Sequence, residues 1–263
     1  MKRVKLLLIV LTTAIASNVA LAWNNFGHEA IAYVAEKHLT PKAKEECRRY
    51  LNHSLPYYAT WMDYYRNVGI FKPTNFWHGI KTDNNGLIDP EPRGHGAGII
   101  QTNRIMKEMK KYKELPDSTV RQNIIYLIHM IPDMHCPVHI NFPSKSFPQY
   151  RYALRNKGKK LSLHGYWDGI LNYYHRKKWD ARRYYNEVDN VSPKKAKAYC
   201  KGSVVRWGDD CIATAHKAYR LTPKDKEVVK ISRDEREEIL TFADECALKG
   251  AYRLATVLNK IFK

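Results

Sequence analysis

Eleven residues, His129-Met-Ile-Pro-Asp-Met-His-Cys-Pro-Val-His139, bring three histidines and one aspartate into an otherwise apolar part of the chain. His129 and Asp133 are four residues apart, and the same spacing recurs at His164 and Asp168. Residues i and i+4 lie on one face of an α-helix, so each pair would direct two polar groups to one point. A pocket to which two such helices contribute would be a site for several metal ions.

The neighbours of the first pair predict that this centre is buried, because they are almost all aliphatic: Ile124, Ile125, Leu127, Ile128 and Ile131. A buried imidazole or carboxylate has to be paired or metal-bound to offset its desolvation. One histidine in such a segment is usually structural, whereas two His-x3-Asp repeats favour a site for several metal ions. Nitrogen and oxygen ligands suit zinc, with manganese or iron as alternatives, and Cys136 is a candidate soft ligand.

Residues 1–22 have the pattern of a cleaved secretory signal, with a basic start, the apolar run Leu6 to Leu11, and Ala20-Leu-Ala22 at its end. Cleavage after Ala22 would leave Trp23 at the N-terminus of a secreted or periplasmic protein. No later segment approaches eighteen consecutive apolar residues, so we expect no stable membrane insertion. Residues 23–263 contain no linker or repeat, which predicts a single domain.

The formal net charge is +19, and loss of the three basic residues in the signal lowers it to +16. This charge favours an acidic partner such as nucleic acid or an anionic surface, although a generally solubilising basic surface explains it equally well. The five cysteines show no C-x-x-C metal spacing. Their odd number leaves at least one unpaired in a monomer, and a Cys200–Cys211 disulfide is one open alternative.

Helix signals dominate the rest of the chain. Thr40-Pro41 and Ser192-Pro193 predict helix starts, and Ser232 with Glu235 has the capping-box spacing. The apolar residues after Ser232 recur every three or four positions as far as Ile261, which predicts a long amphipathic last helix.

The helix that carries His129 and Asp133 is expected to be capped by Asp117 or Ser118, bent by Pro132 and ended by Pro137. The exception to the helical trend is the segment from Tyr150 to Leu163, which predicts a short β-hairpin around Asn156-Lys-Gly158. This hairpin is strongly basic, and it is either a phosphate-contacting edge or a solvated charged surface.

The ordered set of candidate ligands resembles the S1/P1 nuclease family of zinc-dependent single-strand nucleases and 3′-nucleotidases. The motifs that carry the resemblance are Trp23 as the new N-terminus, Gly27-His28, Trp61-Met-Asp63-Tyr-Tyr-Arg66, His78, His129-x3-Asp133-x5-His139 and His164-x2-Trp167-Asp168. The resemblance implies an all-α fold of the phospholipase C/P1 nuclease type, in which one mostly helical domain carries a small β-hairpin and a trinuclear zinc cleft.

The resemblance also assigns the ligands of three zinc ions per chain. They are Asp63, His78, His129 and Asp133 for one ion, His139, His164 and Asp168 for the second, and Trp23, His28 and Asp133 for the third. Trp23 would bind through its free amine and carbonyl oxygen, which would couple signal cleavage to activation. Asp133 would also orient the attacking water. Arg66 would hold a phosphate oxygen, with a structural ion pair to Asp63 as the alternative.

The implied substrates are RNA, single-stranded DNA and 3′-nucleotides, cleaved by a monomer to 5′-phosphate products. Family members commonly stack a base on an aromatic residue after the histidine that corresponds to His78, but here Gly79 follows and Trp77 precedes it. The candidate substrate-binding residues are therefore Trp77 and the basic residues of the hairpin segment, Arg151, Arg155 and Lys159.

Two alternative functions remain. A zinc-dependent phospholipase C would resemble this family in fold and metal site, but it usually has Glu in place of Asp168 and a longer step from its N-terminal Trp to the first His. A non-catalytic zinc or nucleic-acid binding protein would keep the ligands and lack turnover. Among the remaining histidines, His135 is the best candidate to support a ligand from behind, since it lies between Asp133 and His139.

Overall fold

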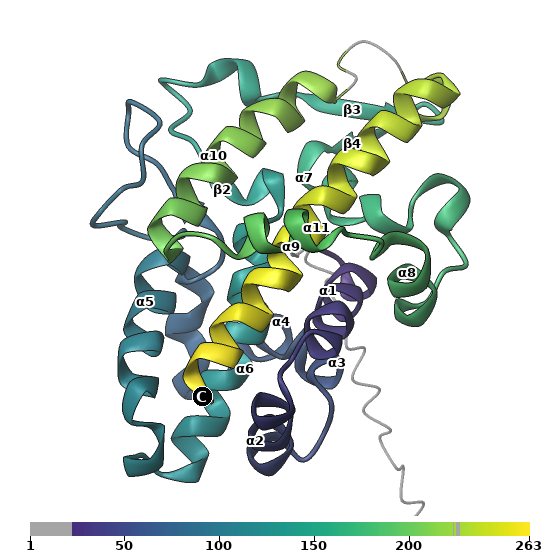
Figure 1. Ribbon diagram of the computed structural model, residues 1–263. Helices are drawn as coiled ribbons and strands as arrows, with labels where there is room; N and C mark the ends of the chain where they lie inside the picture. Colours follow the sequence, from purple (N-terminus) through teal and green to yellow (C-terminus); the bar gives the residue numbers. More distant parts are fainter. Residues whose placement is uncertain (1–22, 223, 225–226) are drawn as a thin grey trace, which may run out of the picture.

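Helix α6 (Asp117–Met134) is the central element of the protein, a computed structural model that describes residues 23–222, 224 and 227–263. Every residue from 123 to 140 is buried. From residue 123 onward α6 is buried on all sides, and it is enclosed by α1 (Asn25–Lys37), α5 (Gly98–Glu108) and α11 (Arg233–Ile261) among others (Figure 1).

The described residues are mostly helical, which confirms the predicted all-α fold class. The remaining α-helices are α2 (Pro41–Leu51), α3 (Leu55–Tyr58), α4 (Trp61–Tyr65), α7 (Leu163–Asp168), α8 (Ala181–Val188), α9 (Pro193–Cys200) and α10 (Val204–Leu221). Short 3-10 helices join them: η1 (Gly69–Phe76), η2 (Met109–Glu114), η3 (Pro137–His139), η4 (Pro148–Tyr150), η5 (Ile170–Asn172), η6 (Tyr174–Arg176) and η7 (Val228–Lys230).

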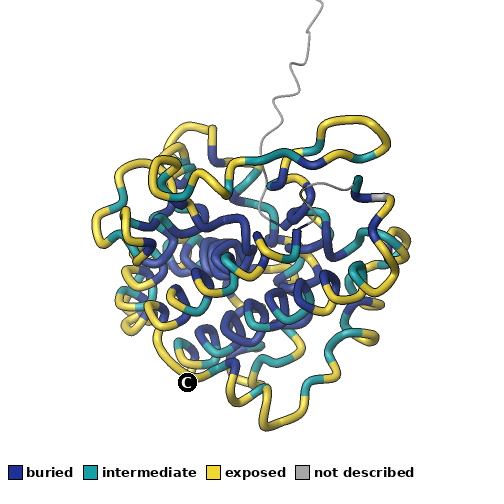
Figure 2. The backbone as a smooth tube through the Cα atoms, turned by 90° about the horizontal axis from the view of Figure 1, so that it is seen from above, coloured by how far each residue is buried: buried dark blue, intermediate teal, exposed yellow. Residues whose placement is uncertain are grey.

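The long last helix is confirmed as α11, which packs along α1, the first helix of the described chain (Figure 1). Its start has both bonds of the capping box, because the Glu235 N–H donates to Ser232 Oγ and the Ser232 N–H donates to the Glu235 carboxylate. Figure 2 shows the buried backbone gathered at the middle of the molecule. In the described ranges, none of the helices combines the length and apolarity that a membrane span requires.

Local signals give most helix starts correctly and one incorrectly. The Thr40 and Ser192 side chains cap α2 and α9, with Pro41 and Pro193 as the first helical residues. The predicted cap of α6 is wrong: Asp117 is already helical and Pro116 precedes it without a side-chain cap. Asp117 instead places a negative charge in the first turn, where the helix dipole favours it. The helix then continues through its internal proline and ends at Met134.

Two pairs of short strands complete the fold of the described residues. The predicted hairpin is confirmed as β3 (Ala153–Asn156) and β4 (Lys159–Ser162), with positive φ at both turn residues, Lys157 and Gly158. The second pair was not expected: β1 (Ile80–Lys81) lies parallel to β2 (Ile140–Asn141). All five cysteines are free thiols, so the alternative of a Cys200–Cys211 disulfide is wrong.

Candidate metal centre

Eight of the nine predicted metal ligands contribute side chains to one cluster, although they come from six segments. Helix α1 provides His28, and α4 provides Asp63. The short segment between η1 and β1 provides His78, and α6 provides both His129 and Asp133. His139 ends η3, and α7 carries the remaining pair, His164 and Asp168. The two His-x3-Asp pairs therefore lie on helices, as their spacing predicted.

Asp133 is the centre of the cluster. Its fully buried carboxylate has one oxygen 2.7 Å from His78 Nδ1, and the other lies 3.3 Å from His28 Nε2 and 3.5 Å from His129 Nε2. The neighbours on its two oxygens come from three different segments. A carboxylate in this position can ligate two metal ions at once.

A second group of ligand atoms surrounds His129. Its Nε2 lies 3.7 Å from Asp63 Oδ1 and 3.2 Å from His78 Nδ1. On the other side of the ring, Nδ1 donates to the carbonyl oxygen of Ala59 at 2.7 Å. Because that bond fixes the tautomer, the lone pair of Nε2 faces the cluster, as a metal ligand requires.

The third group contains His139, His164 and Asp168. The two imidazole Nε2 atoms are 2.7 Å apart, and His164 Nε2 lies 3.4 Å from Asp168 Oδ2. Cys136 is close by, with its Sγ 3.8 Å from Asp168 Oδ1. Burial and the Asp168 carboxylate raise the pKa of the Cys136 thiol well above its usual value. Its Sγ nevertheless lies close enough to ligand atoms of His139 and Asp168 to share a cation with them.

The unexpected β1–β2 pair positions two of these ligands. It aligns Ile80 with Ile140, so the residues just before them, Gly79 and His139, lie in contact. Gly79 has φ +72°, and a Cβ there would be 2.2 Å from the carbonyl oxygen of His139. No side chain fits at this position, which explains in physical terms why an aromatic residue cannot follow His78 in this chain.

Burial and the neighbouring groups of the cluster shift the pKa values of its carboxylates and imidazoles. Burial alone would raise the pKa of Asp133, but His129, His78 and His28 outweigh burial and hold that pKa well below its usual range. Burial and the neighbouring carboxylates Asp133 and Asp63 raise the pKa of Asp168 well above its usual range. Burial and a neighbouring imidazole lower the pKa values of His28 and His139. His28 and His139 therefore favour the neutral form that binds metal.

Several polar atoms of the cluster have no hydrogen-bond partner although they are buried. They are both ring nitrogens of His28, both carboxylate oxygens of Asp63, His78 Nε2 and Asp133 Oδ1. Buried polar groups are normally satisfied, and each orphan costs about 1–3 kcal/mol. So many orphans in one cluster of imidazoles and carboxylates fit a set of cation ligands, and the donor types are those of zinc.

Trp23, the ninth predicted ligand, is fully buried beside the cluster. Its indole Nε1 donates to the carbonyl oxygen of Pro132 at 3.0 Å, next to Asp133. Gly27 allows this packing, because a Cβ there would be 2.7 Å from the Trp23 Cβ. The next residue, Asn24, donates its backbone N–H to the carbonyl oxygen of Asp168 at 2.7 Å. The start of the described chain is thus held between α6 and α7.

Arg66 lies at the end of α4, and its guanidinium is 3.5 Å from Asp63 Oδ1. It also lines a cavity of about 260 Å³ over the cluster, together with Asn75, His78, His95, His139, Asn141 and His164. Asn75, His95 and Asn141 were not predicted from the sequence, since none belongs to a ligand spacing. Arg66 is thus both an ion-pair partner of a ligand and part of the cavity wall.

A second cavity of about 260 Å³ adjoins the first and shares Asn141 and His164 with it. Its wall includes the aromatic residues Phe142, Tyr150, Tyr152 and Tyr219, none of which was singled out in the sequence.

The four predicted substrate-binding residues are dispersed. Arg151 lines this second cavity and donates to the carbonyl oxygen of Phe142. Trp77 packs against Tyr126 outside both cavities, and Arg155 and Lys159 lie on the hairpin, also outside them.

His135 does not contact a metal ligand through its ring nitrogens. Its Nδ1 donates to the Ile131 carbonyl oxygen at 2.7 Å, and its Nε2 accepts from Arg253 of α11 at 2.8 Å. Burial and the Arg253 charge lower the pKa of His135 to about 3. It therefore stays neutral and joins α6 to α11.

Comparison with known proteins agrees with this geometry. The S1/P1 nuclease family model matches residues 23–263, so the chain belongs to that family. A curated relative is nuclease S1 of Aspergillus oryzae, 25% identical over 144 residues that make up 51% of this chain. The match spans about half (50%) of the length of that relative.

Proposed function

We propose that this protein is an extracytoplasmic, zinc-dependent endonuclease that hydrolyses RNA and single-stranded DNA to 5′-phosphate products, and also acts on 3′-nucleotides. The observation that carries the proposal is the buried convergence of imidazoles and carboxylates on Asp133, in a chain of the S1/P1 nuclease family. We further propose that residues 1–22, which lie outside the described residues, form the secretory signal.

The three groups of ligand atoms would form three zinc sites. Asp63, His78, His129 and Asp133 would hold one ion, and His139, His164 and Asp168 the second. Trp23, His28 and Asp133 would hold the third. Zinc bound in these sites would stabilise negative charge on the phosphate and leaving oxygens and acidify an attacking water.

The side chains of the protein supply the remaining chemistry. Asp133, ionised because its pKa is depressed, would orient the water that attacks phosphorus. Arg66 lines the cavity and has five N–H donors, so it would hold a non-bridging phosphate oxygen as charge develops. The ion pair with Asp63 keeps the guanidinium in place before substrate binds.

The aromatic cavity beside His164 would accept the base next to the scissile phosphate. Stacking on tyrosine or phenylalanine does not depend on base identity, since every base has a π face. A base in a duplex is already stacked and cannot enter. Single-strand preference would therefore follow from this cavity, in place of the aromatic residue that Gly79 excludes.

The test is hydrolysis by protein that starts at Trp23, with single-stranded DNA, RNA and a phosphatidylcholine emulsion as substrates. Each assay is run after chelation and again with zinc restored. We expect zinc-restored cleavage of both nucleic acids and none of the lipid. Lipid cleavage alone would establish a phospholipase C, and absence of turnover despite bound zinc would establish a binding protein.

The role of Trp23 has its own test, in which the same protein carries one additional alanine before Trp23. Zinc bound through the free amine would lose that ligand, so the extended protein should retain fewer zinc ions and less activity. Equal zinc content and activity in the two proteins would exclude the N-terminal amine as a ligand.

A further inference from the structure

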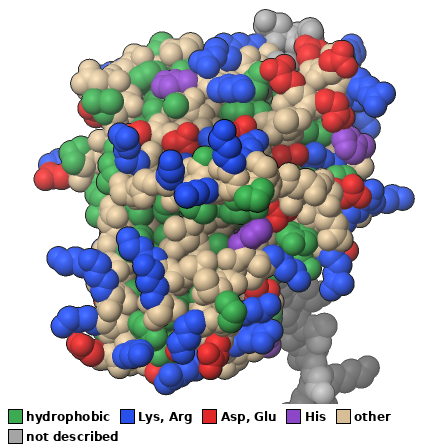
Figure 3. Space-filling model, in the orientation of Figure 1, with side chains coloured by type: hydrophobic (Ala, Val, Ile, Leu, Met, Phe, Trp, Pro, Cys, Tyr) green, Lys and Arg blue, Asp and Glu red, His purple; other side chains and the backbone are tan. Residues whose placement is uncertain are grey.

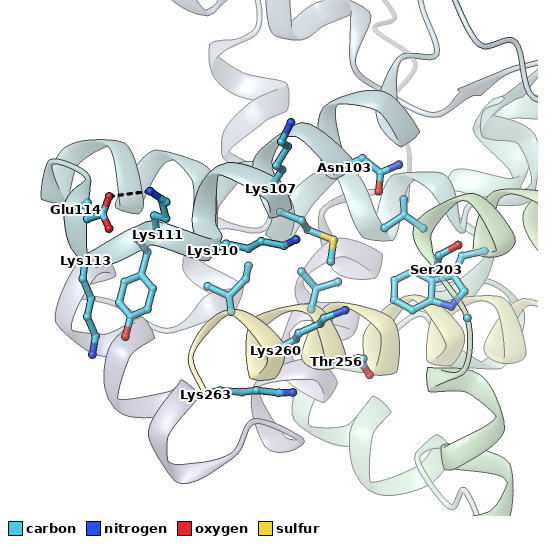
Figure 4. A pocket seen from close by; sticks show the side chains of 17 residues that line it. Asn103, Lys107, Lys110, Lys111, Lys113, Glu114, Ser203, Thr256, Lys260 and Lys263 are labelled. Carbon is cyan, nitrogen blue, oxygen red and sulfur yellow. Dashed lines mark ion pairs between the residues drawn. The ribbon is translucent and has the colours of Figure 1, made fainter.

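A cavity of about 840 Å³ lies away from the metal centre, between α5 with η2, the start of α10 and the end of α11 (Figure 4). Six of the residues that line it are lysines, and we call it the lysine groove. They are Lys107, Lys110, Lys111, Lys113, Lys260 and Lys263. In Figure 3, Lys and Arg side chains gather at the lower left, over this part of the molecule.

The positive charge of the groove is poorly compensated. Among the side chains of its wall, one is a carboxylate, Glu114, which lies 3.5 Å from Lys111 Nζ. Among the residues that the structure describes, none places a carboxylate within 4.0 Å of Lys107, Lys110 or Lys260. Figure 4 shows Lys110 and Lys260 extending into the space between the two segments that carry them. Like charges brought together in a concave site favour an anionic occupant.

The floor of the groove adds two features. It has an apolar part that includes Met106, Trp207 and Val257. It also includes Ser203 and Val204, at the start of the eighteen-residue helix α10. A helix N-terminus carries partial positive charge, so it strengthens the preference that the lysines create. A ligand with alternating anionic and apolar groups matches this wall.

Helix α5 connects the groove to the metal centre. It begins at Gly98, whose N–H donates to the carbonyl oxygen of Gly79, the residue after His78. At 1.5 Å per residue, Lys107 lies about 14 Å along the helix, a distance that about four stacked nucleotides span. Arg104 lies between Gly98 and Lys107 on α5, with its guanidinium 5.6 Å from the centroid of the Trp77 ring.

We propose that the lysine groove binds the phosphodiester backbone of a single-stranded nucleic acid, several nucleotides away from the bond that is cut. The inference rests on the proposed nuclease function and extends it. The groove would hold long substrates and contribute nothing to dinucleotides, so the enzyme would discriminate by chain length without reading sequence.

The first experiment measures binding without turnover. Chelator-treated protein is titrated into a fluorescent sixteen-nucleotide oligothymidylate at several salt concentrations. The Lys107/Lys110/Lys260→Ala variant should bind about tenfold more weakly, and its plot of log affinity against log salt should be shallower by about two, because three contacts of ~0.7 each are lost. The matched control replaces three exposed lysines elsewhere, Lys178, Lys194 and Lys197, and should bind like the unaltered protein.

The second experiment measures KM with zinc restored. The groove variant should have a KM about tenfold higher for the sixteen-mer, with the same kcat and with unchanged KM for a dinucleotide. Equal losses in the groove variant and the control would overturn the proposal, because net charge alone would explain them. Groove-dependent binding to phosphatidylserine vesicles, with unchanged oligonucleotide binding, would overturn it in favour of a membrane surface.

The two proposals fail in different ways. A protein that binds the oligonucleotide through the groove and cleaves nothing supports the groove and contradicts the nuclease. If the unaltered protein, the groove variant and the control variant all cleave both substrates, and the KM for each substrate is the same in all three, the result supports the nuclease and contradicts the groove.

Discussion

The candidate metal centre and the lysine groove both concentrate polar groups, but under opposite conditions. Asp133 and His129 are fully enclosed, while the lysines of the groove are exposed to water. In the enclosed site the lost hydration cannot be recovered, so the positions of a few atoms decide what binds. In the groove, water and salt screen each charge, so the number of charges decides. A single substitution should therefore abolish the first site and only weaken the second.

The largest expected effect comes from Asp133→Asn. The amide is a weaker ligand and cannot carry the charge that two metal sites share, so kcat/KM should fall by at least about a thousandfold, with loss of zinc. Zinc content and oligonucleotide hydrolysis measure both effects. The exposed Asp209→Asn change is the control. If the Asp133→Asn protein keeps its full zinc content, Asp133 is not a zinc ligand.

Arg66 lies at the edge of the enclosed site, where it lines the cavity over the cluster. Arg66→Ala should lower kcat by about a hundredfold with zinc content preserved, because one donor to the transition state is lost. Arg66→Lys should recover part of that loss. The control is Arg183→Ala, which removes an exposed ion pair with Glu187. If Arg66→Ala lowers only the thermal stability, the arginine is a structural partner of Asp63.

His135 tests whether burial has the stated electrostatic effect. Its pKa is lowered from 6.5 to about 3 in the folded protein. Between these two pH values the imidazole is protonated in the unfolded chain and neutral in the folded protein. The corresponding stability is present above pH 6.5 and is lost as pH falls towards 3. In chelated protein, His135→Asn should remove about 2 kcal/mol of the decrease in unfolding free energy between pH 7.5 and 5. Urea titrations check this, with exposed His53→Asn as control; an unchanged pH slope in His135→Asn contradicts the assignment.

Cys136 should give the smallest effect. The proposed ligand sets are complete without its thiol, which lies 3.8 Å from Asp168 Oδ1, so Cys136→Ser should keep the full zinc content and change activity by less than about twofold. Metal analysis of the variant decides the point. Loss of one zinc ion would identify Cys136 as a ligand of the group that contains His139.

The sequence predicts the enclosed site better than the exposed one for a physical reason. The pairs His129 with Asp133 and His164 with Asp168 are local, and the helix period alone aligns each of them. The contact of Gly79 with His139 depends on two-residue strands that lie sixty positions apart, and no local pattern encodes such a pair. The aromatic cavity beside His164 likewise joins distant segments.

The lysine groove was beyond sequence reasoning for the same reason. Lys107 and Lys260 come from opposite parts of the chain and meet only because α5 and α11 lie on either side of the groove. In the sequence, each is one lysine among many. The cap of α6 shows a smaller limit, because Asp117 suits both the cap position and the first turn, and helix boundaries read from sequence are uncertain by a residue.

The most direct test of the metal centre is diffraction from crystals of the protein that starts at Trp23, grown with zinc and measured on both sides of the zinc absorption edge. The account predicts three anomalous peaks among the nine proposed ligands, with Asp133 between two of them. Peaks at other residues, or none at these ligands in a protein that still cleaves nucleic acid, would contradict it.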